Sequence, residues 1–172
     1  MPIRQVTTFS LLTNSYLEIM VSQEFTLQYE LHGAGWATVS VAQVHSVEMT
    51  VSYLHDSLRQ LAESAIALER AAKQSKVIFM NEPGEHQLCL TRSGVDELDY
   101  QIRWYDDWES WGLYPTDQYK VVLSGQVSFT RYREQVVKIL HDIYNSIGVE
   151  RYKELWVEHD SPMNEYRTLN NL

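Results

Sequence analysis

The segment SYLHDSLRQLAESAIALERAAKQ, residues 52–74, shows the hydrophobic spacing of an amphipathic helix. Its apolar positions recur every three or four residues, at Leu54, Leu58, Leu61, Ala62, Ala65, Leu68 and Ala72. The pattern predicts a helix over 53–73, with Ser52 as its N-cap. Charged residues occupy the opposite face, so we expect the helix to pack one apolar stripe against a sheet.

The residues before this helix alternate apolar and polar side chains, as half-buried strands do. Three stretches follow this pattern: EFTLQYEL (24–31), WATVSVAQ (36–43) and SVEMTVS (46–52). The two glycines of HGAGW (32–36) predict a turn between the first two. Further upstream, VTTFSLL (6–12) and YLEIMV (16–21) are expected to form one or two more strands.

After the helix, strand patterns return. KVIFMNEPGEHQLCLTR (76–92) predicts a hairpin with its turn at 82–85, because a Pro-Gly pair is typical of tight turns. ELDYQIRWY (97–105) and QYKVVLSGQVSF (118–129) predict two further strands.

Glu82, Glu85 and His86 carry ligand atoms for a cation. A solvated hairpin tip is the favoured interpretation of these residues, and no metal site is predicted.

A second amphipathic helix is predicted over 130–147, followed by a short helix at VERYKELW (149–156). The apolar stripe of the longer helix consists of Val136, Val137, Leu140, Ile143, Tyr144 and Ile147. Gly148 is a typical residue for a helix end. The last residues, 159–172, are polar and are expected to form a tail that is at best partly ordered.

The order of these elements predicts a single α+β domain over 1–158, followed by a polar C-terminal tail, 159–172. We expect a largely antiparallel sheet of about six or more strands, packed by two main helices. The helix residues expected in the core are Leu58, Leu61, Leu68, Leu140 and Ile143. Val51-Ser52-Tyr53 and Val127-Ser128-Phe129 stand at corresponding strand-to-helix junctions, which suggests a duplicated strand-meander-plus-helix unit.

The chain has 172 residues, with 14 Lys and Arg against 23 Asp and Glu, and a formal net charge of -9. A negative surface repels nucleic acid and anionic membranes and favours cationic partners. The N-terminal sequence carries no evident signal peptide, and no segment reaches the roughly 18 apolar residues of a membrane span. These features predict a cytoplasmic protein that binds neither nucleic acid nor membrane.

No motif in the sequence identifies a reaction: it contains no Gly-rich phosphate loop, HExxH helix or Gly-x-Ser-x-Gly elbow. Three His-Asp pairs occur, at His55-Asp56, His141-Asp142 and His159-Asp160. Adjacent residues on a helix point in different directions, so these dipeptides alone build no site. The single cysteine, Cys89, alternates with two leucines and is expected to be a buried structural thiol. We predict no catalytic residue, no metal and no cofactor.

One segment combines aromatic and acidic residues, RWYDDWESWGLYP, 103–115. Tryptophan and tyrosine supply contact area at low entropic cost, and charges at a rim accelerate association. The residues predicted to contact a partner are Asp106, Asp107, Trp108, Glu109, Trp111 and Tyr114. The alternative is that the loop folds onto its own core. Trp104 continues the apolar face of 97–105, so it is assigned to packing.

The stretch from SYLHDSLRQLAESAIAL to FMNEPGEHQLCLTR, within residues 52–92, resembles a group of small uncharacterised bacterial proteins. They share a Tyr-Leu-x-Asp helix start and a Glu-Pro-Gly turn, and some of them look like immunity partners encoded beside polymorphic toxins. The resemblance covers about a quarter of the chain, and its motifs are structural. It implies a cytoplasmic bacterial protein without enzymatic activity.

These observations favour an acidic binding protein, most concretely an immunity-type protein that neutralises a cationic partner such as a toxin domain. Two alternatives stay open. One is a small-molecule or carbohydrate-binding domain that uses the aromatic residues of 104–114. The other is a hydrolase whose scattered carboxylates form a site that the sequence does not reveal. The oligomeric state is also left open.

Overall fold

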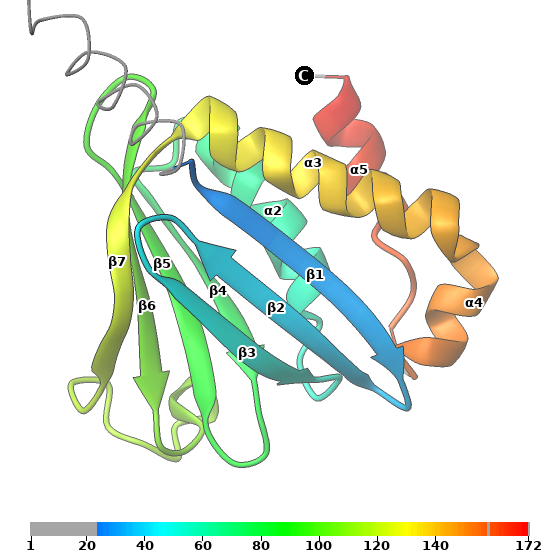
Figure 1. The fold of residues 1–172 in the computed structure, drawn as a ribbon, viewed down its shortest axis with the longest axis horizontal. Coiled ribbons are helices and arrows are strands. Elements are labelled where there is room, and N and C mark those ends of the chain that lie inside the picture. The colour runs from blue at the N-terminus through cyan, green and yellow to red at the C-terminus, as the bar shows by residue number, and fades with distance from the viewer. Residues whose placement is uncertain (1–23, 158, 172) are drawn as a thin grey trace, which may run out of the picture.

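The computed structural model describes residues 24–157 and 159–171, which form seven strands and four α-helices (Figure 1). The strands build two antiparallel sheets, one of three strands and one of four. The α+β fold class predicted from the sequence is confirmed. The strands, which we expected in a largely antiparallel sheet, are divided between two. The predicted strands at 6–12 and 16–21 lie outside the described residues.

Each sheet is a simple meander, in which every strand pairs with its neighbour in sequence. The first contains β1 (Thr26–Gly33), β2 (Trp36–Ala42) and β3 (Ser46–Ser52). The second contains β4 (Gln74–Met80), β5 (Glu85–Arg92), β6 (Glu97–Tyr105) and β7 (Lys120–Ser128). The predicted turn at 82–85 joins β4 to β5. Its Gly84 has a φ of 85°, and the Trp104 ring lies 2.5 Å from the place of a Cβ, so glycine is required.

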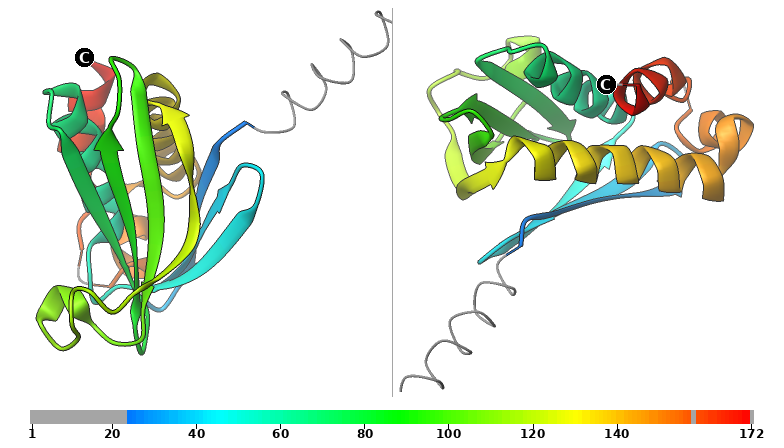
Figure 2. Two further views of the ribbon diagram at one scale, coloured as in Figure 1. Left: turned by 90° about the vertical axis from the view of Figure 1, so that its left-hand side faces the viewer. Right: turned by 90° about the horizontal axis from the view of Figure 1, so that it is seen from above.

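The helices are α2 (Ser57–Glu69), α3 (Phe129–Ser146), α4 (Gly148–Leu155) and α5 (Met163–Asn170). α2 packs beside β4, and α3 packs beside β1. The right-hand view of Figure 2 shows α3 lying between β1 and α5. The helices and both sheets share one hydrophobic core. All five helix residues expected in the core are buried: Leu58, Leu61, Leu68, Leu140 and Ile143.

The first helix is shorter than predicted. It begins at Ser57 rather than at 53, and its N-cap is Asp56, whose carboxylate accepts a hydrogen bond from the Arg59 amide at 3.4 Å. Ser52 still pairs with Trp36 in the sheet and donates its hydroxyl to Glu82 at 2.5 Å. The chain therefore needs residues 53–56 to turn from the strand into the helix.

Ser128, which occupies the corresponding position before α3, does act as an N-cap and accepts from the Arg131 amide at 3.0 Å. A meander followed by a helix thus occurs twice, although the two matched serines have different roles. The duplication remains a hypothesis.

The C-terminal segment 159–172, predicted to be a polar tail, contains α5. Leu169 on this helix is fully buried in the core. Arg59 on α2 forms an ion pair with Glu165 on α5, with Nη1 and Oε1 2.9 Å apart. Apolar burial and this ion pair together dock the segment against α2. The short helix predicted at 149–156 is present as α4. It begins at Gly148, whose φ of 76° interrupts the helical path after α3.

Candidate functional site

The loop of residues 106–119, between β6 and β7, covers one end of the outer face of the four-stranded sheet. This face points away from the main core. Five of its residues are nonetheless buried: Ile78, Met80, Glu85, Gln87 and Tyr105. The three apolar ones lie outside the main core cluster. Small groups of buried residues outside the main core are common under long loops.

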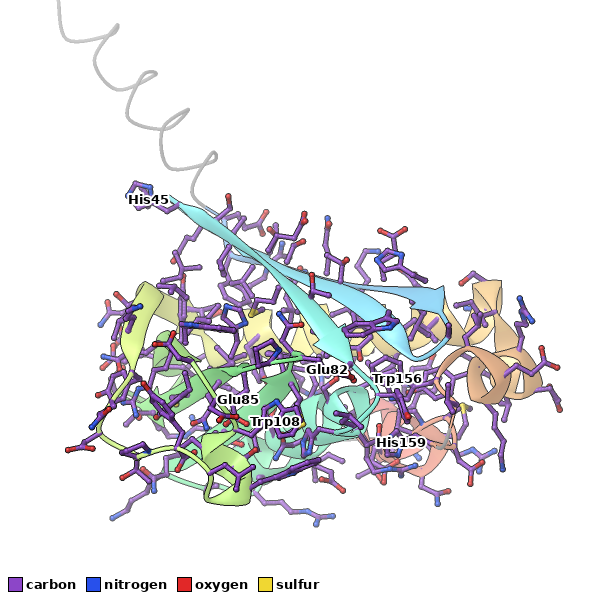
Figure 3. All side chains as sticks on the ribbon, turned by 90° about the horizontal axis from the view of Figure 1, so that it is seen from below. His45, Glu82, Glu85, Trp108, Trp156 and His159 are labelled. Carbon is purple, nitrogen blue, oxygen red and sulfur yellow. The ribbon has the colours of Figure 1, made fainter. Side chains whose placement is uncertain are left out.

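Glu85 fixes the loop from below. Its side chain is completely buried, and its Oε1 accepts hydrogen bonds from the Ser110 amide at 3.1 Å and from Gln87 Nε2 at 2.5 Å. Its Oε2 accepts from the Ser110 hydroxyl at 2.5 Å. Figure 3, a view from below, shows Glu85 and Trp108 in the same region of the molecule. The hairpin tip that we expected to be solvated is therefore covered at Glu85, whereas Glu82 is exposed.

The aromatic residues of the loop divide into packed and exposed ones. Trp108 is half-buried and donates its Nε1 proton to the Asn81 carbonyl at 2.8 Å. Tyr114 is half-buried edge-on against Tyr105, with ring centroids 6.5 Å apart. Trp111 packs against Trp108 in a T-shaped pair, with ring centroids 4.8 Å apart, and remains 48% exposed. Trp111 is therefore the tryptophan of this loop that is most available to a partner.

The acidic residues also differ in their surroundings. The Asp106 side chain is 57% exposed and accepts from Trp104 Nε1 at 2.7 Å. Asp107 is half-buried and accepts from the Trp108 amide. Glu109 points inward: its side chain is 12% exposed and accepts from Gln87 Nε2 at 2.6 Å. Of the three predicted contact acids, Glu109 thus belongs mainly to the internal network that holds the loop.

Exposed apolar residues concentrate on this loop and on the beginning of β7. Five of the ten large hydrophobic residues that are exposed in the described chain lie within 111–122. We call these five the exposed patch: Trp111, Leu113, Tyr119, Val121 and Val122. Such a concentration is typical of an interaction surface, whereas single exposed apolar residues are ordinary.

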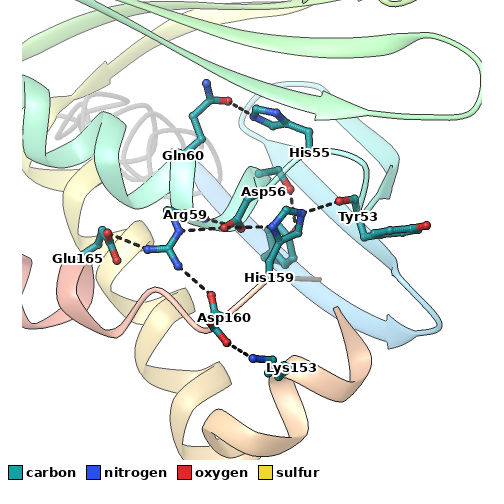
Figure 4. A network of polar contacts seen from close by, with 11 residues as sticks. Tyr53, His55, Asp56, Arg59, Gln60, Lys153, His159, Asp160 and Glu165 are labelled. Carbon is teal, nitrogen blue, oxygen red and sulfur yellow. Dashed lines mark hydrogen bonds and ion pairs between the residues drawn. The ribbon is translucent and has the colours of Figure 1, made fainter. Parts of the chain in front are cut away.

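Two of the three His-Asp pairs meet, although they are far apart in sequence (Figure 4). His159 bonds through Nε2 to the Tyr53 carbonyl at 2.7 Å, and its Nδ1 lies 3.7 Å from Asp56. Arg59 bonds to Asp56 at 2.9 Å and to the Asp160 carbonyl at 3.0 Å. Every one of these groups has a structural partner. The cluster joins the C-terminal segment to the start of α2, a contact that the sequence did not predict.

His86 and Cys89 lie on opposite faces of the four-stranded sheet. His86 packs on Trp104, with ring centroids 4.6 Å apart. Cys89 is only half-buried, not fully buried as predicted, and burial raises the pKa of its thiol. Within residues 24–157 and 159–171, no three His, Cys, Asp or Glu side chains are grouped as metal ligands.

Replacing Trp111 with alanine is expected to lower the free energy of unfolding by at most about 1 kcal/mol, because a half-exposed side chain leaves no closed cavity. Truncating a buried tryptophan costs about 3–5 kcal/mol. Urea unfolding of the variant measures the difference. Val95→Ala, at an almost fully exposed position on the turn between β5 and β6, is the matched control. A loss in the range of buried tryptophans would show that Trp111 is a packing residue.

No protein-family model matches the chain, and no curated protein or solved structure matches it significantly. In the part of the chain that the structure describes, no helix has the length and apolar character that a membrane crossing requires.

Proposed function

We propose that this chain is a non-enzymatic binding protein of the immunity type, and that the loop 106–119 contacts a cationic protein partner. The observation that supports this proposal best is an exposed tryptophan on an immobilised loop. Trp111 is 48% exposed, while Glu85, Gln87 and Asn81 hold the neighbouring residues by hydrogen bonds. A contact loop that is already ordered loses little entropy on binding.

Charge supports a cationic partner. Asp106 and Asp117 are exposed on the same loop as Trp111, and the whole chain carries a formal charge of -9. Exposed acids at the rim of an interface accelerate association with a positive surface. A nuclease-like toxin domain needs a positively charged groove for its substrate, and an acidic surface is suited to cover such a groove.

The experiment is affinity capture from the organism that encodes the chain, followed by binding kinetics with the captured protein. We expect a basic protein to be captured. Trp111→Ala should then accelerate its dissociation, since an anchor residue contributes on the order of 2 kcal/mol or more. Joint replacement of Asp106 and Asp107 by asparagine should mainly slow association and weaken its dependence on salt. Glu109 stays unchanged, because its replacement would disturb Gln87.

Two control variants separate a specific surface from general effects. Val95→Ala removes an exposed apolar side chain at the opposite end of the four-stranded sheet. Glu30→Gln with Glu48→Gln removes two exposed charges from the three-stranded sheet. Both controls should bind at the wild-type rates. A partner without excess positive charge would contradict the proposal, and so would equal binding by wild type and Trp111→Ala.

A further inference from the structure

A second feature of the four-stranded sheet lies beside the loop, on the same outer face. It is an open groove of about 460 Å³, lined by residues of β4, β5 and β6: Gln74, Ser75, Lys76, Cys89, Leu90, Thr91 and Arg103. Its volume falls in the range of small-molecule sites. Two of its side chains, Lys76 and Arg103, are cationic, in a chain whose net charge is strongly negative.

Arg103 is held in place without a carboxylate. Its Nε and Nη2 donate to the Gln101 amide oxygen at 3.1 and 3.0 Å, and its guanidinium lies 4.3 Å from the centre of the Tyr119 ring. Among the described residues no acidic side chain pairs with it, in contrast to Arg59 and Arg131. The guanidinium is thus fixed in orientation while its charge is not neutralised.

Lys76 is only weakly neutralised. Its single carboxylate contact in the described chain is Glu109 Oε2, at 3.7 Å. That oxygen already accepts a shorter hydrogen bond, 2.6 Å long, from Gln87. The Lys76 side chain is 45% exposed, so its ammonium can move toward a ligand in the groove. The two cations therefore leave a local excess of positive charge above Cys89.

We propose that this groove binds a small oxyanion, either a carboxylate or a phosphate, between Lys76 and Arg103. A planar guanidinium matches both oxyanions with two parallel hydrogen bonds, and an ammonium adds a point charge. The groove borders the exposed patch, because Arg103 contacts the Tyr119 ring, but the proposed anion binding does not depend on the proposed protein partner.

Cys89 allows a direct test, because it is the only cysteine of the chain and lines the groove. The rate at which iodoacetamide, a neutral reagent, alkylates Cys89 is measured while inorganic phosphate or succinate is titrated at constant ionic strength. We expect one of the two anions to slow alkylation saturably, by about tenfold at about ten times its dissociation constant. The anion that protects identifies the ligand as a phosphate or a carboxylate.

Variants distinguish a site from a general salt effect. In Lys76→Gln and in Arg103→Gln the anion should no longer slow the alkylation of Cys89. Each variant is compared with its own alkylation rate without anion, since removing a nearby cation also changes the reactivity of the thiol. Lys138→Gln removes an exposed lysine on α3 and should keep the wild-type protection. Lys76→Gln leaves the Arg103 contacts with Gln101 and Tyr119 intact, so the test does not depend on the Arg103 variant folding. Absence of protection by both anions overturns the proposal, as does protection that persists in Lys76→Gln.

Discussion

Glu85→Ala is expected to lower the free energy of unfolding by about 3 kcal/mol, because three donors beneath the loop would lose their acceptor. These are the Ser110 amide, the Ser110 hydroxyl and Gln87 Nε2. A buried donor left without an acceptor costs about 1–3 kcal/mol; Gln87 is buried, and Ser110 is half-buried. The loop should also lose its order, since Ser110 lies at its centre.

Urea unfolding measures the stability loss, and hydrogen exchange at the Ser110 amide measures the order of the loop. Glu85→Gln is the matched control: its amide oxygen can still accept from Gln87 and from the Ser110 amide, and its NH₂ can donate to the Ser110 hydroxyl. This variant should keep most of the stability. Equal losses in the two variants would mean that the negative charge, rather than the hydrogen bonds, holds the loop.

The general fold was predictable because its signals are local. The alternation in β1, β2 and β6 and the helical spacing of Leu58, Leu61 and Leu68 depend only on near neighbours. The turns were predictable for the same reason, since Gly84 must adopt a positive φ in its own hairpin. The division into two sheets depends instead on long-range packing, which no local pattern encodes.

The loop is the part that the sequence could not place. Glu85 stands next to a Pro-Gly turn, and a carboxylate there is expected to face water. Its burial depends on Ser110, 25 residues later in the chain, and no local spacing connects the two. The same holds for the predicted contact residues: of two acids three positions apart in one segment, Asp106 is exposed and Glu109 is internal.

The C-terminal helix, in contrast, carried a signal that the prediction did not use. Pro162 precedes α5, and Tyr166 and Leu169 are three residues apart on one side of it. The segment was predicted to be a tail because of its polar composition, although this spacing is typical of a helix. The apolar stripe of α5 is short, and Arg59 adds polar contacts to it: Arg59 pairs with Glu165 and binds the Asp160 carbonyl.

The second large effect is a loss of stability as the pH falls from 6.5 to 4, and we expect the protonation of His86 to cause it. Burial lowers the pKa of this imidazole from 6.5 to about 4, and its Nδ1 has no hydrogen-bond partner. In this interval the unfolded chain binds a proton at His86 that the folded chain does not bind. Acidification therefore favours unfolding, by up to about 3 kcal/mol at pH 4, and the effect vanishes above pH 6.5.

The measurement is the free energy of unfolding in urea at several pH values, for the wild type and for His86→Phe. Phenylalanine keeps a ring against Trp104 and cannot be protonated. Carboxylates titrate in the same interval, but they contribute equally to both proteins and cancel in the difference. The wild type should lose about 3 kcal/mol more than the variant between pH 6.5 and pH 4. Parallel curves would show that His86 is protonated as easily in the folded protein as in the unfolded chain, which would require its ring to be solvated rather than packed on Trp104.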